Sequence, residues 1–276
     1  MLERLRNGSI ELEVIETKVP GDATKYTREA YARGHRTFLA VGGDGTGFEI
    51  VNGLFPRADR GERPALAFLP LGTGNSFLRD FSADGTENAS ESLLAAQSRP
   101  CDVIRLTHRE GELYFINLLT LGFAADVAAV TNRRFKRLGE LGYVLGVLTC
   151  LARLNRRAFP LRADKAIEAD RRRCLFLAFS NSKFTGGKMM IAPNADATDG
   201  LIEYVRWGPI GRIGLLRNFP RLFDGTHIHH PMASRAGVQR IDFELDGPVD
   251  VMIDGESLHL ECQSLDILPG ALDVLV

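Results

Sequence analysis

The sequence lacks the features that define several large protein classes. Its 276 residues include four cysteines and one tryptophan, and 34 basic residues nearly balance 35 acidic ones. The cysteines, at positions 101, 150, 174 and 262, show no paired spacing, so the sequence indicates neither a zinc site nor a disulfide framework. The net charge of −1 excludes nucleic-acid affinity driven by overall charge. We therefore expect no nucleic-acid partner.

Long apolar stretches are also missing. The longest uncharged runs, residues 113–125 and 141–152, are shorter than the about 18 residues that a membrane-spanning helix needs. The first residues have no apolar core of the kind found in signal peptides. Hydrophobic residues still make up 45% of the chain, which is typical of a globular protein with a substantial core. We expect a reduced, cytoplasmic protein of one large domain or two ordinary ones.

The first hundred residues alternate strand and helix patterns, with glycines at the junctions. This order is typical of an α/β layer with a parallel sheet, and ligands of such sheets bind at the carboxyl ends of the strands. The expected strands are residues 9–16, 37–41 and 65–71, and the expected helices are residues 22–33, 48–55 and a segment through Phe77 and Leu78.

The pattern changes near residue 101. Strands are expected at residues 113–121 and 174–181, and apolar and polar residues alternate from 241 to 262, which is typical of an antiparallel meander. Helical patterns cover residues 133–157 and 210–223. We therefore predict an α/β nucleotide-binding domain over residues 1–100, to which residues 265–276 return, and a mostly antiparallel β domain over residues 101–264.

Two glycine-rich turns are the sharpest local signals. The sequence AVGGDGT (40–46) and the sequence LPLGTGNSF (69–77) each place glycines between a strand and a helix. Glycines let backbone amides approach an anion closely, and a helix N-terminus favours negative charge. Asp44 would repel a phosphate unless it binds Mg²⁺, orients a hydroxyl or simply caps the next helix. If the two strands are neighbours, both turns flank one crevice.

Two acidic segments lie much later in the chain. Asp196 and Asp199 occupy a loop that could bind a hard cation through oxygen atoms, although a hydrophilic turn explains the same pattern. The sequence IDGE (253–256) is also typical of a plain hairpin turn. Its carboxylates gain importance only if the fold brings them to the crevice.

The ordered set of motifs resembles the diacylglycerol kinase catalytic-domain family, which includes bacterial lipid kinases and the sphingosine and ceramide kinases. The motifs are GGDGT (42–46) with a helix ending in VNGL (51–54), then PLGTGNSF (70–77), PNADATDGL (193–201) and DGE (254–256). The GGDGT motif is shared with NAD kinases and phosphofructokinases. A NAD kinase-like enzyme is therefore the alternative.

The resemblance implies a kinase that uses ATP and Mg²⁺ to phosphorylate a hydroxyl of diacylglycerol, a sphingoid base or a similar lipid. It implies that Glu256, with Asp254 beside it, accepts the hydroxyl proton, and Asp44 competes for that role. The metal position would comprise Asp196, Asp199 and the backbone of Leu201. The implied nucleotide contacts are Gly42, Gly43, Asp44, Gly45, Thr46, Gly47, Phe48, Gly72, Thr73, Gly74 and Asn75.

The sequence departs from the family pattern at three points. It lacks the usual first strand that ends in an Asn-Pro turn, Phe48 stands where the family commonly has Asn, and Ser76 stands where many bacterial members have Asp. A catalytically impaired protein that only binds lipid or nucleotide is therefore a further alternative. A homodimer is compatible with the sequence.

A basic segment suggests contact with a membrane surface. Residues 133–157 contain seven basic residues and one acidic residue, and an apolar stretch lies between the basic clusters. Such a segment suits peripheral binding to an anionic membrane, here the inner membrane surface, although a buried helix with solvated arginines at its ends explains the same pattern.

Overall fold

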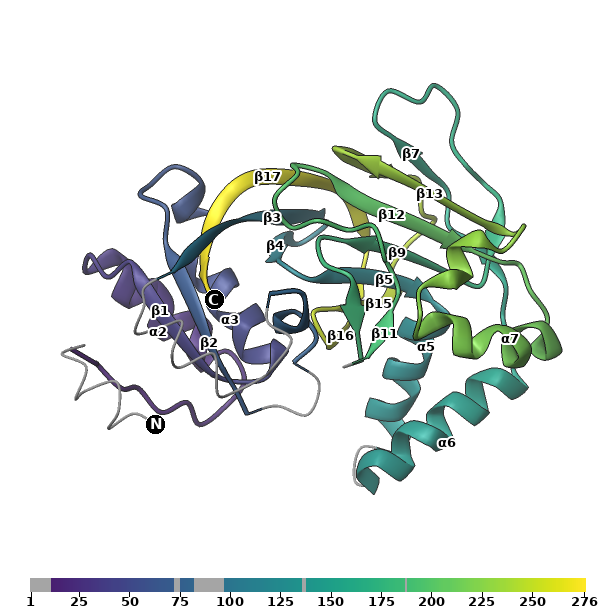
Figure 1. The fold of residues 1–276 in the computed structure, drawn as a ribbon, viewed down its shortest axis with the longest axis horizontal. Coiled ribbons are helices and arrows are strands. Elements are labelled where there is room, and N and C mark those ends of the chain that lie inside the picture. Colours follow the sequence, from purple (N-terminus) through teal and green to yellow (C-terminus); the bar gives the residue numbers. More distant parts are fainter. Residues whose placement is uncertain (1–10, 72–74, 82–96, 136–137, 187) are drawn as a thin grey trace.

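The computed structural model describes residues 11–71, 75–81, 97–135, 138–186 and 188–276. Helices and a short parallel strand pair occupy one end, and an antiparallel sheet occupies the other (Figure 1). Two long strands, β3 (Ser98–His108) and β17 (Cys262–Leu275), run between the two ends and pair with each other. The α/β part followed by a β-rich part agrees with the predicted fold class.

The first part is built around two parallel strands. Strand β1 (Thr37–Gly42) pairs with β2 (Ala65–Pro70) in a register that sets Gly42 opposite Pro70. Their carboxyl ends therefore meet at one edge, as the sequence predicted. The other elements are α2 (Asp22–Ala32), α3 (Asp44–Leu54) and the short 3-10 helices η1 (Arg57–Asp59) and η2 (Leu78–Asp80).

Two predictions for this part are corrected. Residues 11–16, the described portion of the strand predicted over residues 9–16, form no strand, and they pair with no described strand. The helix predicted from residue 48 begins at Asp44, because the glycine turn itself forms the first helical turn. Gly43 precedes it in an extended conformation, and the acidic Asp44 suits the positive end of the helix.

The second part contains a six-stranded antiparallel sheet in the order β13-β12-β9-β5-β15-β16. A seven-stranded mixed sheet contains β1, β2, β3, β4, β7, β14 and β17. The remaining strands are β4 (Gly111–Phe115), β5 (Leu118–Gly122), β6 (Arg157–Ala158), β7 (Leu161–Ala163), β8 (Arg173–Cys174), β9 (Phe176–Ser180), β10 (Phe184–Thr185), β11 (Met189–Met190), β12 (Ile202–Trp207), β13 (Ala233–Val238), β14 (Arg240–Phe243), β15 (Val249–Ile253) and β16 (Glu256–Leu260).

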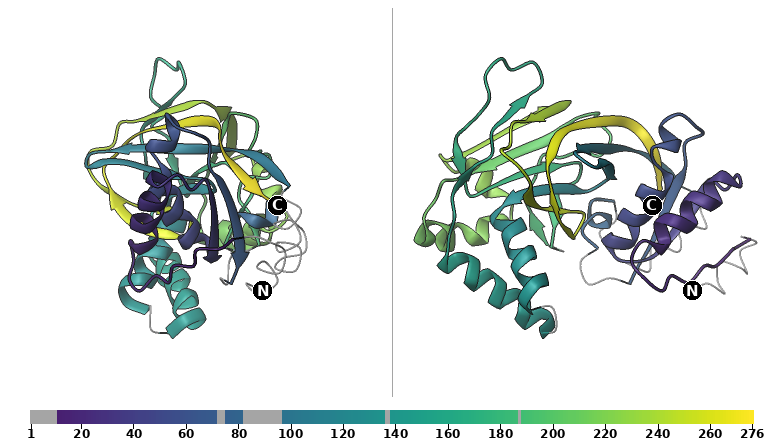
Figure 2. Two further views of the ribbon diagram at one scale, coloured as in Figure 1. Left: turned by 90° about the vertical axis from the view of Figure 1, so that its left-hand side faces the viewer. Right: turned by 180° about the vertical axis from the view of Figure 1, so that it is seen from behind.

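Helices of the second part lie outside these sheets. They are α5 (Phe123–Val130), the π-helical turn η3 (Thr131–Phe135), α6 (Gly139–Ala152), α7 (Arg212–Asn218), η5 (Phe219–Leu222) and η6 (Thr226–His229). The helical stretch predicted over residues 133–157 corresponds to η3 and α6 but is wrong at its C-terminal end, because residues 153–157 are not helical; residues 136–137 lie outside the described residues. All views show α5 and α6 projecting away from the sheets (Figures 1 and 2). No helix among the described residues is long and apolar enough to cross a membrane.

The C-terminal strand joins the two groups of elements. Residues Asp273 to Leu275 of β17 pair in parallel with β2, whereas Leu265 pairs with β14 and is buried with the residues of the second sheet. The return of residues 265–276 to a separate first domain stays a prediction. The domain boundary near residue 100 stays a prediction, because one continuous strand belongs to both groups.

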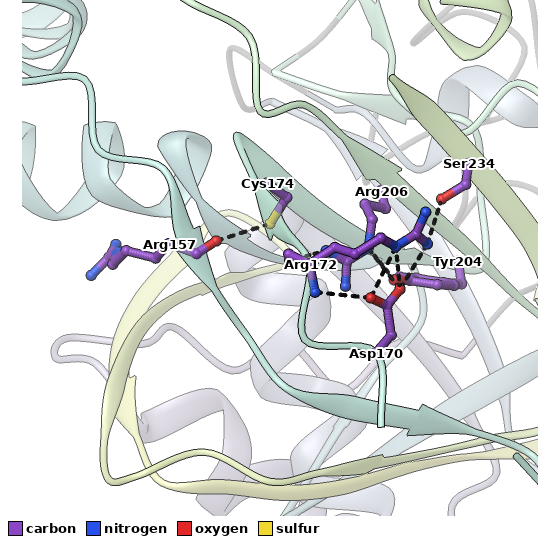
Figure 3. Close-up of polar contacts among 7 residues, drawn as sticks. All are labelled: Arg157, Asp170, Arg172, Cys174, Tyr204, Arg206 and Ser234. Carbon is purple, nitrogen blue, oxygen red and sulfur yellow. Dashed lines mark hydrogen bonds and ion pairs between the residues drawn. The ribbon is translucent and has the colours of Figure 1, made fainter. Parts of the chain in front are cut away.

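A buried arginine fixes a loop to the six-stranded sheet (Figure 3). The Arg206 side chain on β12 is 2% exposed, and its Nε lies 3.1 Å from Asp170 and donates to Tyr204 Oη at 2.9 Å. Asp170 also binds Arg172, whose carbonyl oxygen accepts a further hydrogen bond from Arg206. The ionic network compensates for burying the guanidinium charge.

Candidate active site

The two glycine turns meet at the carboxyl ends of β1 and β2. The backbone N–H of Leu71 donates to the carbonyl of Gly42 at 3.0 Å, and the N–H of Ser76 donates to Asp44 Oδ2 at 3.0 Å. Asn75 adopts a positive φ of 46° between the turn and η2. Gly72, Thr73 and Gly74 of the second turn lie outside the described residues. Asp44 therefore ties the two turns together.

Burial raises the pKa of the Asp44 carboxyl, and hydrogen bonds from Ser76 and Phe77 oppose that shift. The carboxylate thus lies at the junction of the two turns and is held by backbone donors. This environment suits a side chain that orients the two turns. Because its oxygen atoms already accept hydrogen bonds from the protein, the carboxylate is less available to accept a proton from a substrate.

The first turn is closely packed on both sides. A Cβ atom on Gly42 would lie 2.4 Å from Thr46 Oγ1, and one on Gly47 would lie 2.6 Å from the ring of Phe68. Phe48 is buried in the core between the sheets. The side chain of Phe48 and the buried Gly47 therefore face the protein interior, and contact of these two residues with a nucleotide stays a prediction. Residues 47 and 48 occupy the side of α3 that packs on the sheet.

Glu256 approaches the same turn from the other half of the chain. A Cβ atom on Gly45 would lie 2.5 Å from Glu256 Oε1. Glu256 is the first residue of β16 and is exposed. Both groups line a hollow of about 410 Å³, whose lining residues are Thr17, Lys18, Val19, Pro20, Ala23, Gly43, Gly45, Thr46, Glu49 and Glu256. The fold thus brings the DGE segment to the glycine turn.

Asp254 has a different environment from Glu256. It is 3% exposed and adopts a positive φ of 46° at the β15–β16 turn. Its carboxylate accepts the backbone N–H groups of Ile116, Asn117 and Leu118 at 3.1, 3.1 and 2.9 Å. Burial raises the pKa of Asp254 to about 7, partly offset by these donors. This geometry argues against a direct role for Asp254 as proton acceptor, because the carboxylate is enclosed and fully engaged.

Those same contacts explain the break in the strand predicted over residues 113–121. The chain forms β4 and β5 instead, and the amides between them turn toward Asp254 rather than pairing with a strand. The buried side chain of Asn181 binds the carbonyl of Ile116 at 2.9 Å and that of Asp102 at 2.8 Å. A buried polar network thus extends from the DGE turn into the second sheet.

The predicted metal residues lie in the loop before β12. Asp196 Oδ1 accepts the N–H and hydroxyl of Thr198, and Asp199 Oδ1 accepts the N–H of Leu201 at 2.9 Å. Burial raises the pKa of Asp199, and the neighbouring Asp196 and Asp102 carboxylates add to that shift. Among the described residues, no group of three acidic, histidine or cysteine side chains gathers as a metal site. The loop therefore offers carboxylates without a closed set of ligands.

Two further carboxylates near this loop, one buried and one partly buried, were not identified from the sequence. Asp102 accepts the N–H groups of Gly200 and Gly270 at 2.7 and 2.6 Å, which fixes the acidic loop against β17. Asp80 follows the second glycine turn and accepts the N–H of Lys183 at 2.7 Å. The Asp196 carboxylate raises the pKa of both groups after the larger effect of burial. The acidic loop is therefore electrostatically linked to the segment after the second turn.

Other wall residues of the hollow were also missed from the sequence. Residues 17–20 form one wall, and Lys18 is the one cation among the described lining residues. Glu49 accepts the N–H groups of Gly21 and Ala23 at 2.9 and 3.1 Å, so its carboxylate caps α2. Lys18 lies two residues before a Pro-Gly pair, and this sequence is not a motif that would have identified it.

The fold and site bring a glycine turn that follows a parallel strand against an acidic turn of a β-rich part. The family described as "Diacylglycerol kinase catalytic domain" matches residues 1–106. The family described as "YegS C-terminal NAD kinase beta sandwich-like domain" matches residues 117–276. The chain belongs to the diacylglycerol kinase catalytic-domain family, which confirms the resemblance seen in its motifs.

Several relatives match nearly the whole chain. A protein of Alcanivorax borkumensis described as "Probable lipid kinase YegS-like" is 31% identical, and the alignment covers 97% of this chain and 87% of that protein. A diacylglycerol kinase of Mycobacterium tuberculosis is 30% identical, with 99% and 87% covered. A crystal structure of a diacylglycerol kinase from Bacillus anthracis shares the fold, with a TM-score of 0.71, 23% identity and coverage of 98% and 87%.

Proposed function

We propose that this protein is a lipid kinase that transfers a phosphoryl group from ATP, with Mg²⁺, to a hydroxyl of diacylglycerol, a sphingoid base or a similar lipid. The observation that carries the proposal is the close approach of Glu256 to Gly45 at the wall of the hollow. An acid thereby faces the turn whose amides suit a phosphate. The names of the relatives, lipid kinase and diacylglycerol kinase, support a lipid acceptor.

In this proposal the first glycine turn holds nucleotide phosphate. Gly43, Gly45 and Thr46 line the hollow, and the N-terminus of α3 adds favourable partial charge for an anion. Lys18 also lines the hollow and supplies positive charge there. Gly42 and Asp44 shape the turn, and Asn75 together with Gly72, Thr73 and Gly74 stays a predicted second contact.

Glu256 is the proposed proton acceptor, and it is favoured over Asp44 and Asp254. Its side chain is exposed in the hollow, whereas Asp44 accepts the amide of Ser76 and Asp254 accepts three amides. A general base must lie within hydrogen-bond reach of the proton it accepts, which favours the accessible carboxylate. Asp44 and Asp254 then act as positioning residues for the glycine turns and the DGE turn.

The donor set of the acidic loop fits Mg²⁺ that is bound partly through phosphate and water. Mg²⁺ commonly uses one or two carboxylates together with substrate phosphates, so a closed protein cage is not required. Asp196 and Asp199, with the backbone of Leu201, are the proposed protein ligands. The bound cation would neutralise charge on the transferred phosphoryl group.

The test is transfer of labelled phosphate from ATP in mixed micelles, offered to diacylglycerol, sphingosine, ceramide and NAD in parallel. We expect transfer to a lipid and a loss on the order of 100-fold or more in Glu256→Gln, because positioned proton acceptors contribute about that much. Glu261→Gln is the matched control, since Glu261 forms an ion pair with Arg109 at 3.2 Å away from the hollow. Full activity of Glu256→Gln, or transfer to NAD alone, would contradict the proposal.

A further inference from the structure

Helices α6 and α7 expose apolar side chains to solvent. Leu148 on α6 is 55% exposed, and Ile213 and Leu216 on α7 are 68% and 60% exposed. Further exposed apolar residues continue the pattern on both segments: Leu138, Leu145, Phe219 and Phe223. Helices of globular proteins normally turn such residues toward the core. Groups of this size mark an interaction site more often than single exposed residues do.

These two helices are neighbours. Arg212, the first residue of α7, donates from Nε to the carbonyl of Leu151 at 3.0 Å and from an Nη to that of Ala152 at 2.7 Å. It therefore caps the C-terminus of α6 with positive charge. Figure 1 shows the C-terminal end of α6 next to α7, at the end of the molecule opposite β1 and β2.

The surroundings of the exposed apolar residues are basic. Residues 210–223 contain three arginines and no acidic residue. At the C-terminal end of α6, a hollow of about 220 Å³ is lined by Arg133, Arg134, Arg153 and Arg157, with Asp126 and Asp250 as its acidic residues.

The two acids of that hollow are already paired. Asp250 lies 2.9 Å from Arg133, and Asp126 forms an ion pair with Arg157. Arg134 and Arg153 form no ion pair with any acidic side chain in the described part of the chain, and both are exposed. The hollow thus retains two positive charges that an anion could neutralise.

We infer that α6, α7 and η5 form a docking platform for the surface of an anionic phospholipid bilayer. The apolar side chains would enter the interfacial region, and the arginines would bind lipid phosphates, as in interfacial amphipathic helices. A second copy of the chain fits this face poorly, because a twofold contact would oppose the same arginines to one another. The inference rests on the proposed function only in that a lipid kinase must reach a substrate held in a bilayer.

The test is co-sedimentation of the full chain with sucrose-loaded vesicles of phosphatidylcholine alone or mixed with phosphatidylglycerol. We expect binding to the anionic vesicles only, weakened by salt. Ile213→Gln with Leu216→Gln, and separately Arg134→Glu with Arg153→Glu, should each lower the bound fraction by on the order of tenfold. Ile167→Gln is the matched control, because Ile167 is 93% exposed in the loop between β7 and β8, on another part of the molecule.

Absence of wild-type binding, or unchanged binding by both double variants, would overturn the inference. A change in sedimentation mass caused by Ile213→Gln with Leu216→Gln would assign the face to self-association and would equally overturn it. Phosphate transfer to lipid in detergent micelles separates a failure of the docking inference from a failure of the proposed kinase function. We expect the platform variants to keep wild-type transfer there, whereas an inactive wild type would contradict the kinase proposal without affecting vesicle binding.

Discussion

At the scale of single residues, protonation of Asp254 affects the stability of the fold. Asp254 lies in the same turn as Glu256, two residues before it. Its buried carboxylate holds three amides, and burial raises its pKa from 3.8 to about 7. Between those two values the folded chain retains a proton that the unfolded chain releases. The contribution of this group to the free energy of unfolding therefore falls as pH rises through that window and is lost above about pH 7.

This sign gives a measurable prediction. From about pH 5 to about pH 7, the wild type should lose about 2 kcal/mol of unfolding free energy that Asp254→Asn does not lose. Urea unfolding of both proteins across this range measures the difference, and shared titrating groups cancel in the comparison. Parallel pH profiles for the two proteins would show that Asp254 does not retain the proton.

A substitution at Gly45 tests how closely Glu256 must approach the first glycine turn. A Cβ atom there would meet Glu256 Oε1 at 2.5 Å, and the flexible glutamate can move away. We expect Gly45→Ala to lower kcat by on the order of tenfold to 100-fold, because the proton acceptor is displaced, while stability changes by less than about 1 kcal/mol.

Gly211→Ala is the control for that substitution, because a Cβ atom at Gly211 meets nothing within 4 Å and its φ is −82°. Measurements of phosphate transfer and thermal unfolding of both variants show whether Gly45→Ala lowers kcat without lowering stability. Unreduced kcat in Gly45→Ala would mean that Glu256 does not act from the position seen here.

At the scale of elements, strand β12 depends on the buried guanidinium of Arg206. Loss of this group leaves Asp170 and Tyr204 without one of their partners. We expect Arg206→Met to lower the free energy of unfolding by about 3 kcal/mol. Arg172→Met should cost less than about 1 kcal/mol, because that side chain is 66% exposed although it binds the same Asp170. Equal losses in denaturant unfolding would show that burial does not distinguish the two arginines (Figure 3).

The elements also show what the sequence could predict. Strands β1 and β2 and helix α2 follow local rules of apolar periodicity and glycine stops, and their bounds were predicted to within about two residues. The meander at the end of the chain was likewise visible, because β15 and β16 alternate apolar and polar residues around an Asp-Gly turn. The site motifs GGDGT and DGE stood out for the same local reasons.

What could not be predicted depends on contacts between distant segments. Residues 113–121 are mostly apolar, and the distant side chains of Asp254 and Asn181, which bind the backbone at residues 116–117, explain why β4 ends before β5 begins. Phe48 follows the glycine turn in sequence, yet its place on α3 directs it into the core. Lys18 and Asp102 reach their sites through tertiary packing, and no local pattern marks either residue.

At the scale of the whole molecule, β17 joins strands of both parts of the chain in the seven-stranded sheet. Its last residues pair with β2, most of its length pairs with β3, and its early residues pair with β14. Leu272 and Val274 are fully buried against the first part, whereas Leu265 is fully buried in the core shared with the second sheet. Because one strand supplies core residues to both parts, neither part can unfold without exposing apolar surface of the other.

This continuity predicts a single unfolding transition. Trp207 is the only tryptophan and is fully buried on β12, so its fluorescence reports on the six-stranded sheet. Val274→Ala removes two methyl groups from the core around α3 and β2, and we expect a loss of about 2 kcal/mol. The guanidinium midpoint measured by Trp207 fluorescence should shift as far as the midpoint measured by far-UV circular dichroism. A Trp207 transition that stays at the wild-type midpoint would mean that the six-stranded sheet folds independently and that β17 does not couple the two parts.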